Sequence, residues 1–417
     1  MINWLNSLIC ISKQIAMLQA NDAFPLECQW KIWLSDNEQL SKLRLVQFEK
    51  ADNLPLIWDS MANQNPLVSR NHLSALENAN ADLAAFYFIL YEGDKPLTCF
   101  YFQLITLSRN NYDKFSEKKW LNELFGLYIN HRKYGLLICG SIFHSHFQGI
   151  FSNQNVSNEL ILRALCRSID RIRSKKKVSA ILLKDTPLWI QTILQKDSAG
   201  FTKLPDDISM EMEIPNSWIT FEDYYQSLTA KYATRVRKVR QNLDTVVRKE
   251  LSLQEIQIYQ KQIHNYYLQI LQKQSIRIGI IPENYFYAIK QRLPENFWVF
   301  GYFHKEDLVA FSTGYSFEQT IEVHYIGFDS VRNNELSLYF NILLDGVSDA
   351  ILQKKKKLIL GRTALEAKAI LGCKPKILYN YLRTHSSLLS WSVELFYEWF
   401  QQGQNENWKN RNPFKRT

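Results

Sequence analysis

The chain has 417 residues, of which 46% are hydrophobic and 13% aromatic, and its formal net charge is +9. This length and composition predict two well-packed globular domains and exclude a disordered chain. The positive charge favours anionic partners such as phosphates, nucleic acid or a membrane surface, although a charge spread this thinly is equally typical of a solvated surface.

Six cysteines are spread along the chain without a C-x-x-C pair, and most lie in apolar segments: Cys10, Cys28, Cys99, Cys139, Cys166 and Cys373. This usage is typical of buried thiols in a reducing compartment. The N-terminal sequence lacks the basic leader and long apolar core of a signal peptide, and no apolar stretch reaches the length of a membrane span. We therefore expect a cytoplasmic protein without a transmembrane segment, and peripheral contact with a membrane stays open.

The first half alternates between strand and helix patterns. After an N-terminal extension, residues 1–39, the predicted elements are a strand at 43–48, helices at 54–61 and 72–77, strands at 86–91 and 97–105, an inserted segment at 108–133, a strand at 135–139, a loop at 140–149, a helix at 158–173 and a strand at 178–183 before a further helix. The loop holds His144 and His146 without a third ligand nearby in the sequence, so we predict no metal site there.

The same order of elements recurs in the second half. A helix, a run of lysines, an apolar strand and a second helix occur at 158–195 and again at 336–371, and a two-stranded hairpin precedes each copy. Helix and strand alternate in any α/β protein, but five elements in matching order favour a duplication. The sequence therefore predicts an α/β protein with two mixed sheets, one in each copy.

Between the halves, residues 218–249 are predicted to form one amphipathic helix. Val236, Val239, Leu243 and Val246 share one side, and cations occupy the others: Lys231, Arg235, Arg237, Lys238, Arg240 and Arg248. A solvated helix explains this pattern equally well. Alternatively, Arg235, Arg237 and Arg240 bind a phosphate-rich ligand, since guanidinium groups hold phosphate with paired hydrogen bonds.

The stretch 321–372 predicts a strand–turn–helix–strand–helix unit. A strand begins at Ile321, a turn follows at Asp329–Glu335, a helix starts at Leu336, and an apolar strand follows a basic run. Thr363 and Glu366 have the spacing of a capping box for the last short helix, which stops at Gly372. In such a unit the turn after the first strand faces a phosphate group.

Three segments resemble one family. NPLVSRNHLSALE from residue 65, GRTALEAKAILGCKP from residue 361, and the aromatic, arginine-rich segment 218–249 are similar to bacterial Fem-like proteins, the peptidoglycan-bridge aminoacyltransferases of the GNAT superfamily. The resemblance covers most of residues 40–385. It implies two tandem GNAT-like domains related by duplication, at 40–205 and 206–390, and a C-terminal helix and tail at 391–417.

The resemblance also implies transfer of an acyl or aminoacyl group to an amine-bearing substrate, such as a cell-envelope precursor. Acyl-CoA or aminoacyl-tRNA is the expected donor, and no resident cofactor is required. The segment from Arg332 differs from the superfamily pattern, because Glu335 and Ser337 stand where glycines let bare amides approach a pyrophosphate. We therefore expect weak CoA binding, which favours a tRNA-type donor or the alternative of a catalytically inactive protein that binds an anionic ligand or precursor.

Four residues are candidates for catalysis. GNAT folds place proton-transferring groups on the strand before the donor turn, where Glu322 and His324 share one face, and often a tyrosine one turn into the next helix, as Tyr339 is. Lys368 matches a lysine of the Fem-like motif. The ordinary alternatives are a core histidine, a solvent-facing glutamate, a buried tyrosine and a lysine that covers its helix. The candidates for binding the donor's anionic group are Arg332, Asn333, Asn334 and Arg362.

Overall fold

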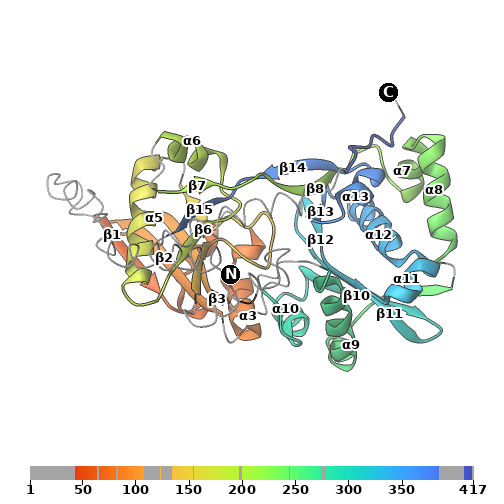
Figure 1. Cartoon of the computed structure of the whole chain (residues 1–417), viewed down its shortest axis with the longest axis horizontal. Coiled ribbons are helices and arrows are strands. Elements are labelled where there is room, and N and C mark those ends of the chain that lie inside the picture. Colours follow the sequence, from red (N-terminus) through yellow and green to blue (C-terminus); the bar gives the residue numbers. More distant parts are fainter. Residues whose placement is uncertain are drawn as a thin grey trace, which may run out of the picture.

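The computed structural model describes residues 43–62, 65–80, 83–107, 123, 134–153, 155–196, 200–243, 245–273, 279–384 and 408–415. They form two lobes, each built on one mixed sheet (Figure 1). The predicted N-terminal extension, the insertion at 108–133 apart from Glu123, and the start of the C-terminal segment lie outside the described residues. Within the described ranges, no helix is both long and apolar enough to cross a bilayer.

The sheet of the first lobe has the order β1-β2-β3-β4-β6-β15-β7, with β5 paired to β3. Its strands are Leu43–Phe48 (β1), Ala84–Glu92 (β2), Lys95–Leu107 (β3), Tyr134–Cys139 (β4), Ile150–Ser152 (β5), Ala180–Leu183 (β6), Thr202–Lys203 (β7) and Tyr381–Thr384 (β15). The helices of this lobe are Ala51–Asn53 (η3), Ile57–Met61 (α2), Pro66–Val68 (η4), Arg70–Ala79 (α3), Asn158–Arg173 (α5) and Leu188–Lys196 (α6).

Helices cover both faces of this sheet because its central strands are apolar on both sides. Tyr87 and Ile89 on β2 pack in the same core as α2 and α3, whereas Phe86 and Phe88 face α5 and α6. The unbroken apolar run of β2 is what a strand buried on both faces requires.

The second sheet has the order β14-β8-β13-β12-β11-β10-β9. Its strands are Asp207–Glu213 (β8), Val246–Glu250 (β9), Phe297–His304 (β10), Asp307–Ser316 (β11), Thr320–Phe328 (β12), Lys357–Gly361 (β13) and Lys374–Leu378 (β14). The helices are Phe221–Ser227 (α7), Ala230–Gln241 (α8), Leu253–Leu271 (α9), Tyr285–Arg292 (α10), Ser330–Leu336 (α11), Leu338–Leu352 (α12) and Leu365–Leu371 (α13). Helices α9 and α10 cover one face, and α7, α8, α12 and α13 cover the other.

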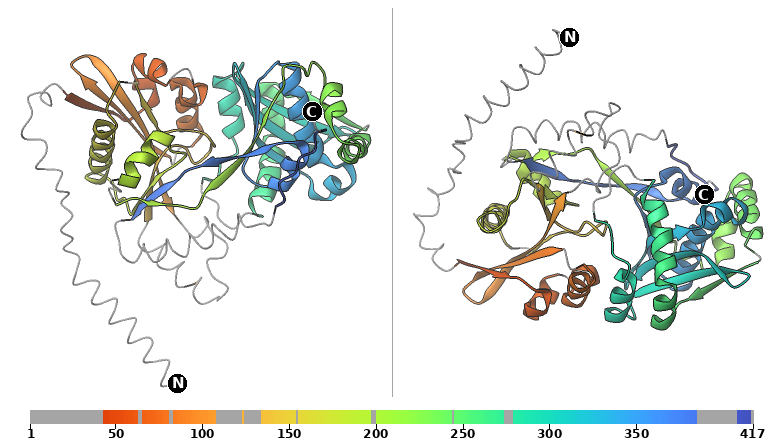
Figure 2. Two further views of the ribbon diagram at one scale, coloured as in Figure 1. Left: turned by 90° about the horizontal axis from the view of Figure 1, so that it is seen from above. Right: turned by 60° about the horizontal axis from the view of Figure 1, so that its bottom comes forward.

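Each lobe contributes one strand to the other. β8 follows β7 in the chain but lies between β13 and β14 in the second sheet, and β15 follows β14 but lies between β6 and β7 in the first. Figures 1 and 2 show these strands running between the lobes. The matching order of strands and this reciprocal exchange confirm the predicted duplication with two mixed sheets.

The lobes also share a hydrophobic core. α3 of the first lobe packs against α10 of the second, and the buried side chains around them form one cluster that includes Tyr101, Phe147 and Tyr315. Burial of this apolar surface and the strand exchange hold the two copies together.

Two local predictions were wrong because capping side chains start helices at positions that the sequence analysis did not predict. Residues 218–249 form α7, α8 and strand β9 instead of one helix, since a Thr220–Asp223 capping box starts α7 and extended backbone at Leu228 and Thr229 ends it. The predicted turn Asp329–Glu335 is the helix α11, because the Asp329 carboxylate accepts hydrogen bonds from the Val331 and Arg332 amides.

The predicted Thr363–Glu366 capping box is also wrong. Helix α13 starts after Ala364, which has φ 50°, and no side chain caps it. The N-cap residue is Ala364 and not Thr363, and Glu366 instead forms an ion pair with Arg411 of the C-terminal segment.

Candidate functional site

Strands β12 and β13 diverge beside the predicted catalytic pair. Their parallel pairing covers only Thr320 to Glu322, although β12 continues to Phe328. On its other edge, β12 stays paired with β11 through an irregularity at Thr313, whose hydroxyl accepts a hydrogen bond from the Tyr325 amide at 3.1 Å. The backbone of β12 beyond Glu322 therefore turns an edge towards the diverging strand, where its amides can meet a ligand.

Glu322 and His324 lie where the strands diverge. His324 Nδ1 is 3.6 Å from Glu322 Oε1, and both side chains are at most 5% exposed. At this separation the contact is electrostatic, because a hydrogen bond requires a shorter distance. A carboxylate next to an imidazole is an arrangement that can accept and stabilise a proton.

Two histidines of the first lobe lie beside His324, one in contact with it and the second behind the first. The His144 ring stacks on the His324 ring with centroids 4.5 Å apart and an interplanar angle of 12°, and His72 meets His144 at 4.8 Å. Burial lowers the pKa of His72 to about 3, partly opposed by the Leu67 carbonyl, and burial together with His324 lowers the pKa of His144 well below its usual range. Both first-lobe rings are therefore neutral near pH 7. No cluster of acidic, histidine or cysteine side chains in the described part of the chain is arranged to hold a metal ion.

Lys368 lies on α13, is 3% exposed, and reaches back towards the end of β13. Its ammonium group donates to the carbonyls of Gly361 at 3.2 Å and Arg362 at 3.1 Å. Burial lowers the pKa of Lys368 to about 7, with the nearby Cys373 weakly opposing. A lysine with this pKa exchanges its proton at neutral pH, which is a property of groups used in acid–base chemistry.

Tyr339 lies at the start of α12, on the same face of the sheet as Lys368. Burial raises the pKa of its hydroxyl, so Tyr339 keeps its proton at physiological pH. Buried Cys373 is close enough to influence the pKa of both Tyr339 and Lys368, which places the three side chains in one neighbourhood. The structure thus brings Tyr339 and Lys368 together on one face, and Glu322 and His324 at the boundary between the lobes.

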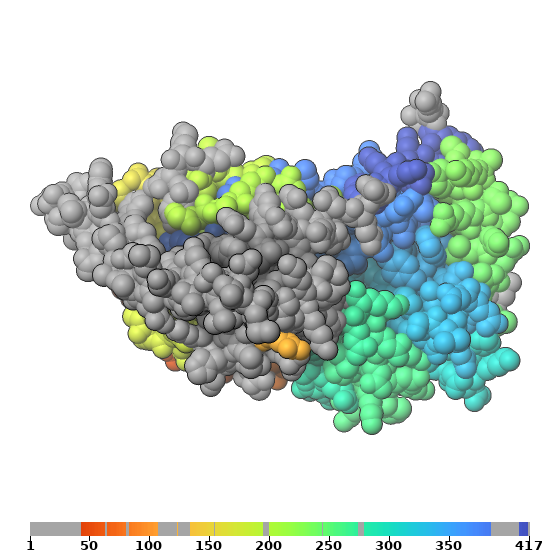
Figure 3. Space-filling view, in the orientation of Figure 1, coloured from red at the N-terminus to blue at the C-terminus, as the bar shows by residue number. Residues whose placement is uncertain are grey.

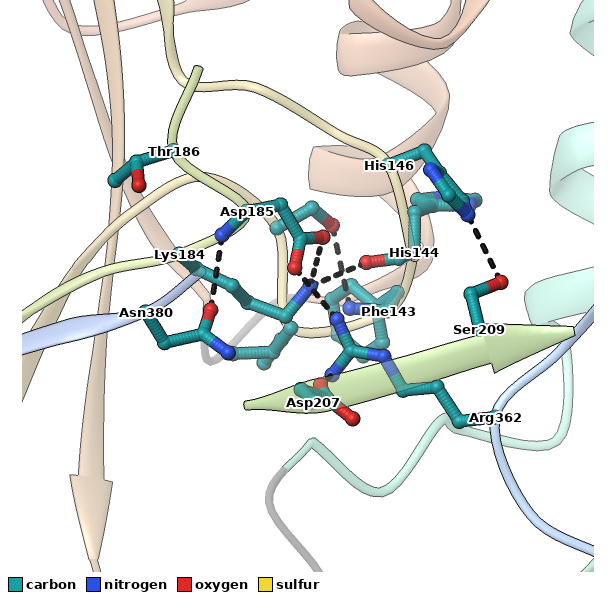
Figure 4. A network of polar contacts seen from close by, with 12 residues as sticks. Phe143, His144, His146, Lys184, Asp185, Thr186, Asp207, Ser209, Arg362 and Asn380 are labelled. Atoms are coloured by element: carbon teal, nitrogen blue, oxygen red, sulfur yellow. Dashed lines mark hydrogen bonds and ion pairs between the residues drawn. The ribbon is translucent and has the colours of Figure 1, made fainter. Parts of the chain in front are cut away.

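Arg362, predicted to bind an anion, takes part in a network between the lobes (Figure 4). Its guanidinium group is 2.6 Å from Asp185 Oδ1 and 2.5 Å from Asp207 Oδ2. Lys184 is 2.8 Å from the other Asp185 oxygen and donates to the His144 carbonyl at 2.6 Å. Burial would raise the pKa of Asp185, but Lys184 and Arg362 outweigh it and lower that pKa.

The sequence prediction missed Asp185, Lys184 and Asp207. A signal was present, because β6 and β13 are each followed within two residues by a charged side chain and then a threonine: Asp185-Thr186 and Arg362-Thr363. Aligning the two copies on these strands pairs the two charged residues and identifies them as candidates for a contact between the copies.

The residues predicted to bind the donor's phosphates are largely occupied by the chain itself. Arg332 is 3.2 Å from Asp307 at the tip of the β10–β11 hairpin. The Asn333 side chain accepts a hydrogen bond from the Tyr339 amide at 2.9 Å. Asn334 and Glu335 are exposed on α11. Because Asp329 and Asn333 take up the amides at the starts of α11 and α12, these helix ends offer few donors to a pyrophosphate.

The three arginines of α8 have different surroundings. Arg240 is 2.6 Å from Asp345 on α12 and lies over the Phe221 ring. Arg237 donates to the Tyr225 hydroxyl, and exposed Arg235 lies over the Phe340 ring. Arg237 and Arg240 line an open groove of about 310 Å³ together with Phe221, Glu222, Tyr225 and Val236. Figure 3 shows the α7–α8 surface at one end of the molecule, beside the C-terminal residues 408–415.

The geometry defines a protein with two copies of one mixed α/β domain, in which a strand diverges from its parallel neighbour in the second copy. No family model and no curated protein matches the sequence. Among solved structures, FemX is similar over 84% of this chain and 100% of its own, at 9% identity and a TM-score of 0.53. A tandem GNAT protein from the clavulanic acid biosynthesis pathway is similar over 82% of this chain and 98% of its own, at 8% identity and a TM-score of 0.52. The chain therefore has the tandem GNAT, Fem-like fold, which confirms at the level of the fold the resemblance carried by its sequence segments.

Proposed function

We propose that this protein is an acyltransferase that moves an acyl or aminoacyl group to an amine, with the reaction in the second lobe where β12 leaves β13. The observation that carries the proposal is the position of Glu322 and His324 at this divergence, with buried Lys368 on α13 directed at the last carbonyl of β13. Edge amides of β12 can polarise the donor carbonyl, and preorganised amides of this kind are a principal source of rate enhancement in acyl transfer.

In this mechanism His324, stabilised by Glu322, accepts the proton of the attacking amine. The amine nitrogen forms a bond to the donor carbonyl carbon, and the bond from that carbon to the sulfur or oxygen of the donor breaks. Tyr339 gives its hydroxyl proton to the departing sulfur or oxygen. Lys368, whose pKa burial lowers to about 7, returns a proton to Tyr339. His324 then releases its proton to solvent and Lys368 takes one up from solvent, which restores both groups for the next cycle.

The helix ends near α11 support a donor other than acyl-CoA. Asp329 and Asn333 occupy the amides that would otherwise meet a pyrophosphate, and exposed Glu335 adds a negative charge. An aminoacyl-tRNA donor does not need this turn, and the exposed cations of α8 supply phosphate contacts for it. We further propose that the acceptor is an amine-bearing cell-envelope precursor, met in the cytoplasm or at the membrane surface, as the Fem-like segments imply.

The same helix ends also favour a second candidate, a catalytically inactive protein that binds an anionic ligand or precursor. Arg362 was expected to bind the donor of an active enzyme, but Asp185 and Asp207 neutralise its charge. Its role is therefore structural, which also favours an inactive protein. In this case α8 and its groove carry the binding, and Glu322 and His324 belong to the core.

One experiment separates the two candidates. The purified chain is incubated with amine acceptors and either acyl-CoA or aminoacyl-tRNA, and the acylated product is measured by mass spectrometry. We expect product with an aminoacyl donor, and a loss of about 10²–10⁴-fold in rate for His324→Gln, the range of a general base. Retention of ligand without turnover by any donor would instead support the binding protein.

A further inference from the structure

The two lobes differ at the point where the strands diverge. In the second lobe, β12 runs through this point with a single irregularity beside Thr313. In the first lobe, the corresponding strand is divided into β4 and β5, which pair with successive parts of β3. Residues 140–149 connect the two parts as a loop, whose residues 143–147 are buried or half-buried.

Hydrogen bonds hold both ends of this loop. The Tyr101 amide donates to the Gly149 carbonyl at 2.8 Å, and the Gly140 amide donates to the Tyr101 carbonyl at 3.2 Å. A Cβ at Gly149 would lie 2.3 Å from the Gly140 nitrogen, so only glycine permits this approach. The Lys184 ammonium group donates to the His144 carbonyl at 2.6 Å and fixes the loop near its tip. The loop is thus a rigid element.

The tip of the loop reaches the second lobe. His146 Nε2 is 2.9 Å from the Ser209 hydroxyl and 3.1 Å from Glu211, both on the exchanged strand β8. His144, which is 2% exposed, stacks flat on His324 at 4.5 Å and 12°. Among the described residues, neither ring nitrogen of His144 nor Nε2 of His324 has a hydrogen-bond partner. The contact of His144 with His324 is therefore made by the ring face alone.

We propose that His144 is a positioning residue for His324, so that the first lobe completes the catalytic pair of the second. This inference rests on the proposed acyl transfer. Rotation of an imidazole about its last side-chain torsion is broad and needs an external constraint. The flat His144 ring supplies that constraint by holding the plane of the His324 ring, and the Glu322 carboxylate attracts Nδ1, which leaves Nε2 directed elsewhere for proton transfer.

The stack is suited to this role because a second cation next to His324 would oppose its protonation. Burial, more than any other cause, keeps the pKa of His144 far below neutrality, so its ring acts as an uncharged flat surface. His72 is neutral for the same reason, and its Nε2 is 3.1 Å from the Tyr315 hydroxyl. A flat apolar ring should therefore replace His144, whereas a side chain of similar volume without a ring should not.

The test compares His144→Phe with His144→Leu, and His146→Ala serves as a loop control that does not touch His324. We expect His144→Phe and His146→Ala to keep kcat within about threefold. We expect His144→Leu to lower kcat about tenfold, near the upper end of what an aromatic pair contributes, with little change in KM. Equal kcat values for the Phe and Leu variants would overturn the proposal.

A second readout is independent of turnover. In protein labelled with ¹⁵N-histidine, NMR shifts report the tautomer of each ring, and His324→Gln assigns the signal of His324. We expect one tautomer of His324 in the unmodified protein and in His144→Phe, and an averaged signal in His144→Leu. An unchanged His324 signal in His144→Leu refutes the positioning role. If no donor supports transfer, the proposed function fails, and the NMR comparison alone decides whether His144 orients His324.

Discussion

Asp185 and Arg362 occupy the same position in the two copies of the duplicated domain and bind each other at 2.6 Å. Asp185 follows β6, Arg362 follows β13, and each precedes a threonine and a short helix. Two identical copies would bring like charges together here, and like charges at this distance repel strongly in a buried environment. A carboxylate in one copy and a guanidinium group in the other make the contact attractive, so the divergence of the copies stabilises their association.

The first prediction concerns this pair. Asp185→Ala leaves Arg362 and Lys184 without their common partner in a buried site, so we expect the free energy of unfolding to fall by about 3–5 kcal/mol. Urea denaturation measures the change. As a matched control, Asp206→Ala removes an exposed ion pair with Lys203, and it should change stability by about 0–1 kcal/mol. Similar small effects for both variants would contradict a structural role for Asp185.

Much of this arrangement follows from local sequence patterns. The strand predicted at 86–91, which the structure extends to Ala84–Glu92, the helix at 158–173 and the βαβ unit near 321–361 were found because apolar periodicity is a local signal. The start of α11 could also have been predicted, since Asp329 is a typical N-cap residue and precedes the first helical residue. The segment was instead predicted to be a phosphate-facing turn. The Fem-like segments further identified the fold.

The exchange of β8 and β15 could not be predicted from the same signals. An apolar strand pattern shows that a strand forms, but the sheet it joins depends on partners more than a hundred residues away. The stack of His144 on His324 has the same origin. One histidine lies in a loop and the other in a strand, and 180 residues separate them in the sequence. No sequence pattern relates the two, and only the pairing of the lobes brings them together.

Because burial lowers the pKa of Lys368, this residue should make the free energy of unfolding depend on pH. Its pKa is about 7 when folded and about 10.5 when exposed, so between these values the unfolded chain binds the additional proton. Lys368 should therefore make the free energy of unfolding rise with pH across this window, by at most about 1.4 kcal/mol per pH unit. The same stability is lost again as pH falls from 10.5 towards 7.

Urea denaturation of Lys368→Met at several pH values from about 7 to 9.5 checks this slope. The variant lacks the titrating group, so its gain in stability over the unmodified protein should be largest near pH 7 and shrink as pH rises. Lys356→Met, a change at an exposed lysine, should show no such trend. A stability difference for Lys368→Met that stays constant with pH would show that the ammonium group keeps its proton in the folded protein.

CoA binding tests the helix ends around α11. We expect the unmodified protein to bind CoA weakly in calorimetry, because Glu335 repels a pyrophosphate and the Tyr339 amide is taken by Asn333. Glu335→Gly together with Ser337→Gly should improve binding, and glycine suits position 337 because its φ is 52°. Adding Asn333→Ala should improve it further by freeing the Tyr339 amide. Micromolar affinity in the unmodified protein would contradict this account and remove the main support for a tRNA-type donor.

The last prediction separates the arginines of α8 by their surroundings. Arg240 is bound to buried Asp345, which also accepts a hydrogen bond from the Tyr302 hydroxyl, so Arg240→Gln leaves a carboxylate without its main cation. We expect a decrease of about 1.5–3 kcal/mol in the free energy of unfolding, the range for a hydrogen bond to a charged group. Arg235→Gln and Arg237→Gln remove exposed guanidinium groups that hold no carboxylate in the described part of the chain, and their stability should stay within about 0.5 kcal/mol.

The two exposed arginines, Arg235 and Arg237, then report on binding without a change in folding. If α8 binds a polyanion, both variants should weaken binding to tRNA, because each removes a cation that would neutralise a phosphate. The slope of log affinity against log salt concentration should also become shallower, by about one unit for each phosphate that is no longer neutralised. Fluorescence anisotropy with labelled tRNA at several salt concentrations measures that slope. An affinity insensitive to both salt and substitution would show that α8 is a solvated surface.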